Sequence, residues 1–346
     1  MTLVLDGPVT PVALTTFMRE VPVQSDLTML NAFPTRNLDK NTVDFAEITR
    51  TNRTARYRSF DGRIHVSERD GGTEKRVRLL PLSSSLNTGE LERLQLEFAR
   101  TGGTNEQALA NAIYNDAEQL TREILARLEQ AWGDVLADGV LTINENGFQG
   151  EADFGVPANQ KGVAPAGAVW SNVAASTPLT DILAWQDIAV ANGWKPEALR
   201  TSQANIRLLQ RNKEIIDAVY GATAGRTRVT VTELNDLLSS EGLPILAPAY
   251  DTQVDVDGAT ARTIPADRVL LTPANLGDLG YTAWGVSATA LTLVGSSAVE
   301  FAFESAPGIV GVIEKVGPPY REYVFADAVA MPILADARKL FIADVR

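Results

Sequence analysis

The feature that most constrains the fold of this chain is one unusually long amphipathic segment, residues 104–138. Apolar residues recur along it at steps of three or four and so fall on one face of an α-helix. They are Leu109, Ile113, Ala117, Leu120, Ile124, Leu128, Ala131 and Val135. A helix of this length extends ~50 Å at ~1.5 Å per residue, whereas helices of globular proteins average ~11–12 residues.

Both ends of this segment carry helix signals. Thr104 and Gln107 have the spacing of a capping box, and Gly139 can adopt the left-handed conformation that ends a helix. Gly133 offers an earlier end. One apolar stripe suits a helix laid across a sheet; a coiled coil is the alternative, although only one such segment exists. The opposite face is acidic and is expected to meet solvent or a neighbouring subunit; its acids are Glu106, Asp116, Glu118, Glu123, Glu129, Asp134 and Asp138.

A basic block precedes the long helix. Residues 50–79 hold nine basic and four acidic side chains in a chain whose net charge is −12. The turn signal Asp70-Gly71-Gly72 predicts a β-hairpin whose strands lie around Ile64–Val66 and Val77–Leu79. The block has too few large apolar residues for a core of its own. Two interpretations stay open: a solvated surface hairpin, or an arm that lies on an acidic neighbouring subunit.

The N-terminal region is interrupted by prolines. Four of them occur in residues 1–49, and each removes a backbone donor, so only short elements fit there. Pro11–Glu20 is predicted as a short helix with proline in its first turn. The remainder is predicted to be an extended arm that needs a partner surface to become ordered. Deleting residues 1–20 is accordingly expected to weaken an assembly more than it unfolds the globular part.

The rest of the chain alternates helical and extended patterns. Further helices are predicted over 90–100, 177–191, 202–220 and 230–240, and residues 158–177 are predicted to form a loop rich in Ala, Gly, Pro and Ser. The last of these helices opens with Thr230 and Glu233 at the spacing of a capping box. Short β-branched runs predict strands. These runs cover 140–157 (a strand, a turn and a strand), 244–250, 253–258 with a tight turn at Asp257-Gly258, 268–273, 309–313, 323–326 and 339–343.

Composition excludes several classes of site. The chain has no cysteine and one histidine, His65, so disulfides, thiolate metal sites and multi-histidine metal sites are impossible. The acidic balance is unfavourable for nucleic-acid binding, which relies on clustered Lys and Arg. No apolar run reaches the ~18–20 residues of a membrane span, and the N-terminus lacks the pattern of a secretory signal.

Catalytic and ligand-binding motifs are also missing. The glycine-containing loop Gly221–Thr227 lacks the lysine of a phosphate-binding loop. Asp251, Asp255 and Asp257 alternate, but no glutamate closes a calcium loop, and a hairpin explains them better. The run Ser83–Ser85 lies outside any nucleophile elbow, and no carboxylate pair stands out in an apolar run. The sequence therefore predicts no catalytic residue, no cofactor and no metal, which favours a structural role.

The order of these blocks resembles the major capsid proteins of tailed bacteriophages, which share the Hong-Kong-97-type fold. Four short strings in the second half are similar to the lambda-type protein E family of actinobacterial phages. They are Ile264–Pro273, Leu279–Gly285, Pro307–Val312 and Ala330–Leu334. The resemblance implies an α+β, HK97-like fold. Its implied parts are an N-arm at 1–48, an E-loop at 49–82, a P-domain at 83–175 with a spine helix at 104–138, an A-domain at 176–305 and P-domain return strands at 306–346.

The resemblance also implies a function. It implies a major capsid protein, not an enzyme, that self-assembles as hexamers and pentamers into the icosahedral head shell of a tailed phage. The shell would enclose double-stranded DNA without sequence-specific binding and without a membrane. A portal and a separate scaffolding protein are the implied partners, a decoration protein is an optional third, and assembly in the host cytoplasm yields the virion capsid.

The basic block supplies the candidate assembly interface. Its proposed residues are Arg56, Arg58, Arg63, Lys75, Arg76 and Arg78. Some capsid proteins crosslink through an E-loop lysine, but nothing around Lys75 indicates such a site. Two rival functions stay open: an encapsulin-like nanocompartment shell, which has the same fold, and a soluble α/β hydrolytic enzyme that uses carboxylates.

Overall fold

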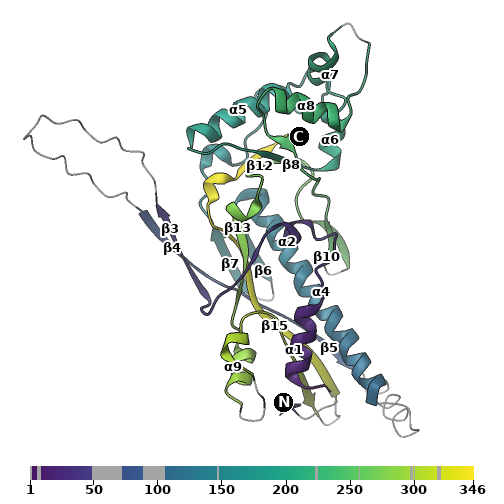
Figure 1. Cartoon of the computed structure of the whole chain (residues 1–346), viewed down its shortest axis with the longest axis vertical. Helices are drawn as coiled ribbons and strands as arrows, with labels where there is room; N and C mark the ends of the chain where they lie inside the picture. The colour runs from purple at the N-terminus through teal and green to yellow at the C-terminus, as the bar shows by residue number, and fades with distance from the viewer. Residues whose placement is uncertain are drawn as a thin grey trace, which may run out of the picture.

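The protein is elongated, and its two larger sheets lie one above the other along its length, with one long helix beside the lower sheet (Figure 1). The structure, a computed structural model, describes residues 2–5, 9–48, 72–88, 106–145, 148–222, 225–256, 258–296, 299, 301–317 and 321–346. The lower part holds α4 and a six-stranded sheet, and the upper part holds a four-stranded sheet covered by helices. The predicted helix at 90–100 lies outside the described residues. No helix in the described ranges is long and apolar enough to cross a membrane.

The predicted long helix is confirmed as α4, Glu106–Asp138, with 33 residues. Its apolar stripe is the centre of the main core, because Leu120, Leu128 and Val135 are fully buried. The helix ends as predicted at Gly139, whose φ is 78°. The N–H of Gly139 donates to the carbonyl of Val135 at 2.8 Å. Spacing of apolar residues alone was thus sufficient to place this element.

The suggestion that Gly133 ends the helix early is wrong. The helix continues through Gly133, and the glycine serves a close approach instead. A Cβ at this position would lie 2.0 Å from the carbonyl oxygen of Thr263. Thr263 directly follows β11 (Ala259–Arg262), which pairs with β10 (Gln253–Val256) across the predicted Asp257-Gly258 turn. Glycine is therefore required where this hairpin crosses the helix.

The six-stranded sheet is built around β15, Arg321–Leu334. One edge of β15 pairs with β14 (Val310–Val316) and then with β13 (Gly280–Gly285), both antiparallel. Its other edge pairs with β5 (Pro81–Thr88). The short strands β1 (Thr2–Leu3) and β2 (Thr35–Asn37) complete the sheet on β14 and β13 respectively. Strand β5 was not predicted, because its serines hide the alternation of half-buried Leu82 and Leu86 with exposed neighbours.

The N-terminal region differs from the prediction. The helix α1, Pro11–Glu20, forms as expected, but it packs onto β14 and α4 of its own chain. Leu14 and Met18 are 0% and 1% exposed. The Thr15 hydroxyl accepts from the N–H of Gly311 at 3.1 Å. The segment after α1 is also held by the body, because Leu27, Leu30 and Phe33 are buried in the main core. The expectation that the arm needs a partner surface is therefore wrong for these residues. The burial of α1 also leads us to expect that deletion of residues 1–20 unfolds the globular part.

Glu129 of α4 corrects the view that one helix face is uniformly exposed and acidic. Its carboxylate is fully buried beneath α2 (Thr28–Ala32). It accepts hydrogen bonds from the backbone N–H of Met29 at 3.0 Å and of Leu30 at 2.7 Å. Burial raises the pKa of Glu129, and these hydrogen bonds oppose the rise. The carboxylate therefore joins the N-terminal segment to the long helix.

Replacement of this carboxylate tests how much its hydrogen bonds to α2 stabilise the protein. Glu129→Gln is expected to lower the free energy of unfolding by ~1–3 kcal/mol, because the amide NH2 would face a backbone N–H. A raised native pKa means that wild-type stability falls as pH rises from the unfolded value toward the native one. The stability difference between wild type and variant should therefore shrink over that range in urea titrations. A pH-independent difference would contradict the role of a buried charge.

The upper unit has a core of its own. Its sheet runs in the order β16 (Phe341–Asp344), β12 (Arg268–Thr272), β8 (Ala198–Thr201), β9 (Ile245–Leu246). Four helices cover this sheet: α5 (Pro178–Ala191), α6 (Gln203–Leu209), α7 (Lys213–Tyr220) and α8 (Val231–Ser240). Trp170, Trp185 and Phe341 are fully buried between the layers. The predicted capping box of α8, Thr230 with Glu233, is confirmed.

The single helix predicted over 202–220 is in fact two helices. Asn212 interrupts it, because its side-chain oxygen accepts from the N–H of Ile215 and starts α7. Its amide donates to the Ser176 carbonyl at 3.1 Å and to the Ser176 hydroxyl at 2.9 Å. A distant loop thus stabilises a break that the apolar periodicity conceals.

Two segments join a different sheet from the one that their expected domains would suggest. Segment 274–305, expected in the A-domain, contributes β13 to the lower sheet, together with α9 (Ala288–Val294). Strand β16, expected among the P-domain return strands, pairs with β12 in the upper sheet. Short 3-10 helices lie in the connections, at Ala158–Gln160, Leu276–Asp278, Phe303–Ser305 and Ala337–Lys339.

Candidate assembly surfaces

A two-stranded hairpin leaves the side of the body (Figure 1). It pairs β3 (Thr42–Ile48) with β4 (Gly72–Arg78), and Val43 faces Val77 in the register. The predicted strand pairing within the basic block is therefore wrong, because the partner of β4 comes from residues before the block. The prolines before β3 favoured short elements in this region, although Val43 and Phe45 alternate with polar residues as in a strand. The intervening residues 49–71 lie outside the described ranges.

The predicted interface residues divide into two groups. Arg56, Arg58 and Arg63 lie outside the described residues, as does His65. Lys75, Arg76 and Arg78 all lie on β4. Arg76 and Arg78 are exposed and share one face of the ribbon, because alternate residues of a strand point the same way. Arg76 stands opposite Asp44 in the register, and Lys75 stands opposite Phe45.

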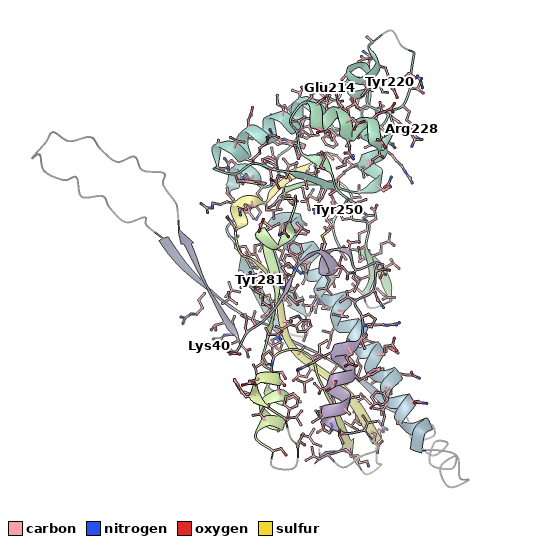
Figure 2. The ribbon with its side chains drawn as sticks, viewed as in Figure 1. Lys40, Glu214, Tyr220, Arg228, Tyr250 and Tyr281 are labelled. Carbon is pink, nitrogen blue, oxygen red and sulfur yellow. The ribbon has the colours of Figure 1, made fainter. Side chains whose placement is uncertain are left out.

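The root of the hairpin is fixed to the body. Leu79 is buried, and its N–H donates to the Asn41 carbonyl at 2.9 Å. The Asn41 side chain accepts from the N–H of Val286 at 2.8 Å and donates to its carbonyl at 2.7 Å. Figure 2 places Lys40 at this root. The hairpin is therefore attached rigidly at one end while Arg76 and Arg78 remain exposed.

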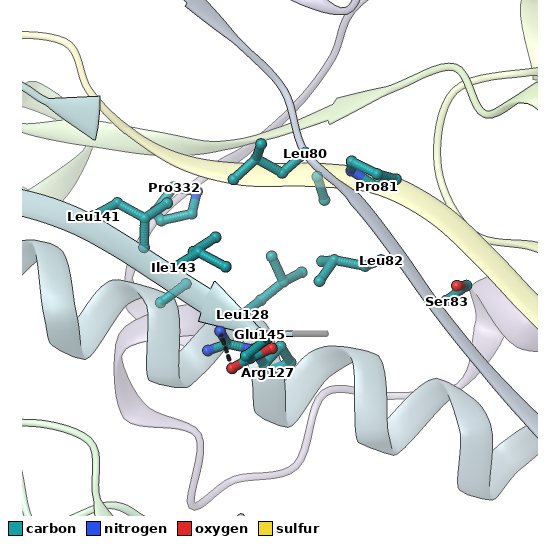
Figure 3. Close-up of a pocket in the computed structure, with 12 residues that line it drawn as sticks. Leu80, Pro81, Leu82, Ser83, Arg127, Leu128, Leu141, Ile143, Glu145 and Pro332 are labelled. Carbon is teal, nitrogen blue, oxygen red and sulfur yellow. Dashed lines mark hydrogen bonds and ion pairs between the residues drawn. The ribbon is translucent and has the colours of Figure 1, made fainter. Parts of the chain in front are cut away.

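A second surface feature is an apolar groove of about 390 Å³ on the long helix. Leu80 and Leu82 line one side of the groove, Leu141 and Ile143 of β6 (Val140–Glu145) the other, and Leu128 of α4 the floor (Figure 3). β6 pairs with β7 (Phe148–Asp153). An ion pair closes one end of the groove, with Arg127 2.8 Å from Glu145.

Among the described residues that line the groove, Ser83 carries the only hydroxyl and no histidine occurs. Ser83–Ser85 lie on β5, and Ser84 donates to Glu123 of α4. These lining residues show no base that would activate a serine nucleophile.

The described residues also offer no metal site. No cluster of three or more potential ligands occurs among them. Two of the three alternating aspartates, which the sequence pattern does not assign to a calcium loop, have partners in the protein; Asp257 lies outside the described residues. Asp251 pairs with Arg262, and Asp255 accepts from the N–H of Gly258 at 2.7 Å. These carboxylates stabilise the β10–β11 hairpin.

The family model of the phage major capsid protein E matches residues 10–290. The chain belongs to that family. As a phage major capsid protein it forms the head shell, it is part of the virion, and its role is structural rather than enzymatic. The family predicted from the strings in the second half is thereby confirmed.

Solved structures show the same fold as this capsid protein. A prophage capsid protein of Escherichia coli CFT073 superposes with a TM-score of 0.59 at 14% identity, covering 96% of this chain and 97% of the other. A phage-related protein of Bordetella bronchiseptica RB50 gives 0.55 at 14% identity, covering 99% and 98%. The capsid of the Myoviridae phage XM1 gives 0.50 at 12% identity, covering 95% and 98%. None of the curated proteins compared matches this chain.

These likenesses confirm the predicted α+β, HK97-like class. The protein self-assembles into a shell, so its neighbours are copies of itself. The exposed hairpin and the groove are surfaces of such a self-assembling molecule. Sequence reasoning missed Asn41, which fixes the hairpin, because nothing in the local sequence distinguishes it from any turn asparagine.

Proposed function

We propose that this capsid protein assembles as hexameric and pentameric rings that close into the icosahedral head around the double-stranded DNA of a tailed phage. The observation that carries the proposal is the β3–β4 hairpin, which leaves the body as a two-stranded ribbon. An isolated two-stranded ribbon is marginally stable in water. Contact with a neighbouring copy supplies the burial that its own body does not.

The hairpin serves as the E-loop in this proposal, and it begins at Thr42 rather than at residue 49. The N-arm is then residues 1–41, held on the body by α1. The spine helix is α4, and the upper sheet with its helices forms the A-domain. The lower sheet forms the P-domain, including β13.

The basic residues Arg56, Arg58, Arg63, Lys75, Arg76 and Arg78 contact an acidic surface of the neighbouring copy in this proposal. Because the whole chain carries −12, a basic arm meets a complementary field on the acidic surfaces of its neighbour. Such complementarity favours encounter and register more than affinity. The same net charge supports enclosure of DNA without specific binding.

The finer partners follow from the family resemblance. A portal, a separate scaffolding protein and a decoration protein complete the proposed head, with assembly in the host cytoplasm. An encapsulin-like shell is the second candidate, because it would have the same fold. Purified particles decide between them: a phage head forms from this chain with a portal and packages DNA, whereas a nanocompartment retains a protein cargo.

Reversing the charge of the hairpin tests the proposed interface. The variant Arg56→Glu, Arg58→Glu, Arg76→Glu and Arg78→Glu is expected to form few or no shells in electron micrographs while its circular dichroism stays unchanged. Like charges placed across an interface cost several kcal/mol, which is ~100-fold or more in association.

A smaller pair provides the matched comparison. Arg76→Glu with Arg78→Glu is compared with Lys161→Glu with Arg321→Glu, which changes the net charge equally on other parts of the surface. The hairpin pair should impair shells and the control pair should not. Normal shells from the fourfold variant would refute the role of the hairpin.

A further inference from the structure

We propose that the A-domain carries two complementary faces through which successive copies contact one another head to tail around a ring. The first, the α5 face, consists of Leu183, Asp187, Val190 and Glu241. The second, the arginine face, consists of Arg207, Arg211, Arg226, Arg228 and Val231. The inference rests on the proposed rings and names the surfaces that form them, which are distinct from the hairpin.

The α5 face is the outer side of a helix that is apolar on both sides. Ile182 and Trp185 pack into the upper core, whereas Leu183 and Val190 are 48% and 51% exposed. Leu183 and Val190 are seven residues apart and therefore share one face. Leu183 and Val190 therefore form an apolar patch on the outer side of α5 that no described part of the chain covers.

Acidic groups border this apolar stripe. Asp187 is exposed and lies between Leu183 and Val190 along the helix. Glu241 is exposed next to α5, because the Gln186 side chain donates to the neighbouring Gly242 carbonyl at 3.3 Å. Neither carboxylate has an ion-pair partner in the described ranges. The α5 face is therefore apolar with an acidic border.

The arginine face gathers four exposed guanidinium groups from two segments. Arg207 and Arg211 come from the region of α6, and Arg226 and Arg228 from the loop before α8. The segments adjoin, because the Val229 N–H donates to the Gln210 carbonyl at 2.9 Å. Arg228 donates to the Gln210 side chain at 3.0 Å.

Arg207, Arg211 and Arg228 have no acidic partner within the described part of the chain, whereas Arg226 lies over the Tyr220 ring, 5.2 Å from its centroid, and its charge acts on Glu233. None of the four forms an ion pair there, and the nearby Lys213 already pairs with Asp217 at 3.5 Å. Glu233 accepts from the Tyr220 hydroxyl at 2.6 Å and caps α8. Val231, 41% exposed, adds an apolar patch beside the arginines. The face is therefore apolar with a basic border.

The positions of the two faces suit a ring. α5 lies at the left of the upper unit in Figure 1 and α6 and α7 at the right; Figure 2 shows Arg228 and Tyr220 at the right end. A ring contact is heterologous, so it needs two different surfaces on each subunit. An isologous contact would place like charges together. A second copy presenting its arginine face to the α5 face therefore satisfies both the charges and the apolar groups.

A charge swap tests the inference. Arg211→Glu with Arg228→Glu, and separately Asp187→Lys with Glu241→Lys, are each expected to raise the protein concentration needed for ring and shell formation by ~10-fold or more. The fourfold variant, in which the two faces exchange charge, is expected to return to within ~3-fold of wild type. Lys161→Glu with Arg321→Glu is the control. Light scattering and electron microscopy give the readout, with circular dichroism to verify folding.

The outcomes separate this inference from the proposed function. If wild type fails to form rings and shells, the proposed function fails. If wild type assembles and either double variant assembles equally well, the inference alone fails. It also fails if both doubles are impaired and the fourfold variant is not rescued, since the two faces then do not meet. Rescue of a folded fourfold variant supports it.

Discussion

A chain lacking residues 1–20 is expected to lose its cooperative unfolding transition, not only its ability to assemble. The deletion removes Leu14 and Met18, which are 0% and 1% exposed. Removal of one such side chain costs ~2–5 kcal/mol, and the total stability of a domain is ~5–15 kcal/mol. The loss of two therefore approaches the whole stability, before the exposure of β14 is counted.

Point substitutions make this result measurable without removing a segment. Leu14→Ala is expected to lower the free energy of unfolding by ~2–5 kcal/mol in urea titrations monitored by circular dichroism. Thr16→Ala is the matched control on the exposed side of α1 and should change it by less than ~1 kcal/mol. Equal, small effects from both would mean that α1 does not pack on the body.

Trp132→Ala is expected to have the largest effect of any single truncation in the lower core. The indole is fully buried and stacks on Phe33, with ring centroids 3.6 Å apart and planes 8° apart. Its N–H donates to the Thr282 hydroxyl at 2.9 Å. The side chain therefore joins α4, the N-terminal segment and β13, and its loss is expected to cost ~3–5 kcal/mol.

Trp132→Phe separates packing from hydrogen bonding. It keeps an aromatic ring against Phe33 but leaves the Thr282 hydroxyl without its donor, so a loss of ~1–3 kcal/mol is expected. Thermal melting and urea titration are expected to rank the three proteins by decreasing stability as wild type, Trp132→Phe and Trp132→Ala. An alanine variant with the same melting temperature as wild type would show that the indole does not join the three elements.

The elements that could be predicted share a local origin. α4 follows from its apolar spacing, α8 from its capping box, and the β10–β11 turn from Asp257-Gly258. Each signal lies within a few residues of the structure it specifies. The family could likewise be predicted, because short strings in the second half are characteristic of it.

The candidate surfaces were predicted less completely. The basic block pointed to the hairpin, and Arg76 and Arg78 are exposed on it. The pairing of β4 with β3 joins segments more than twenty residues apart, so local turn signals chose the wrong partner. The arginine face was missed because Arg207 and Arg228 lie in different segments, which adjoin through the contacts of Gln210.

Apolar periodicity was enough to establish the long helix, and composition was enough to establish the basic block, because each depends on neighbouring residues. The α+β class and the family came from the resemblance of short strings and of the order of the blocks to a known family. Which side of each element is covered depends instead on segments far away in the chain. Glu129 looks like a solvent-facing acid until α2 lies over it, and the short helix α1 has no visible partner in the sequence until it packs on β14. Burial is a property of the packed chain, and only the tertiary structure decides it.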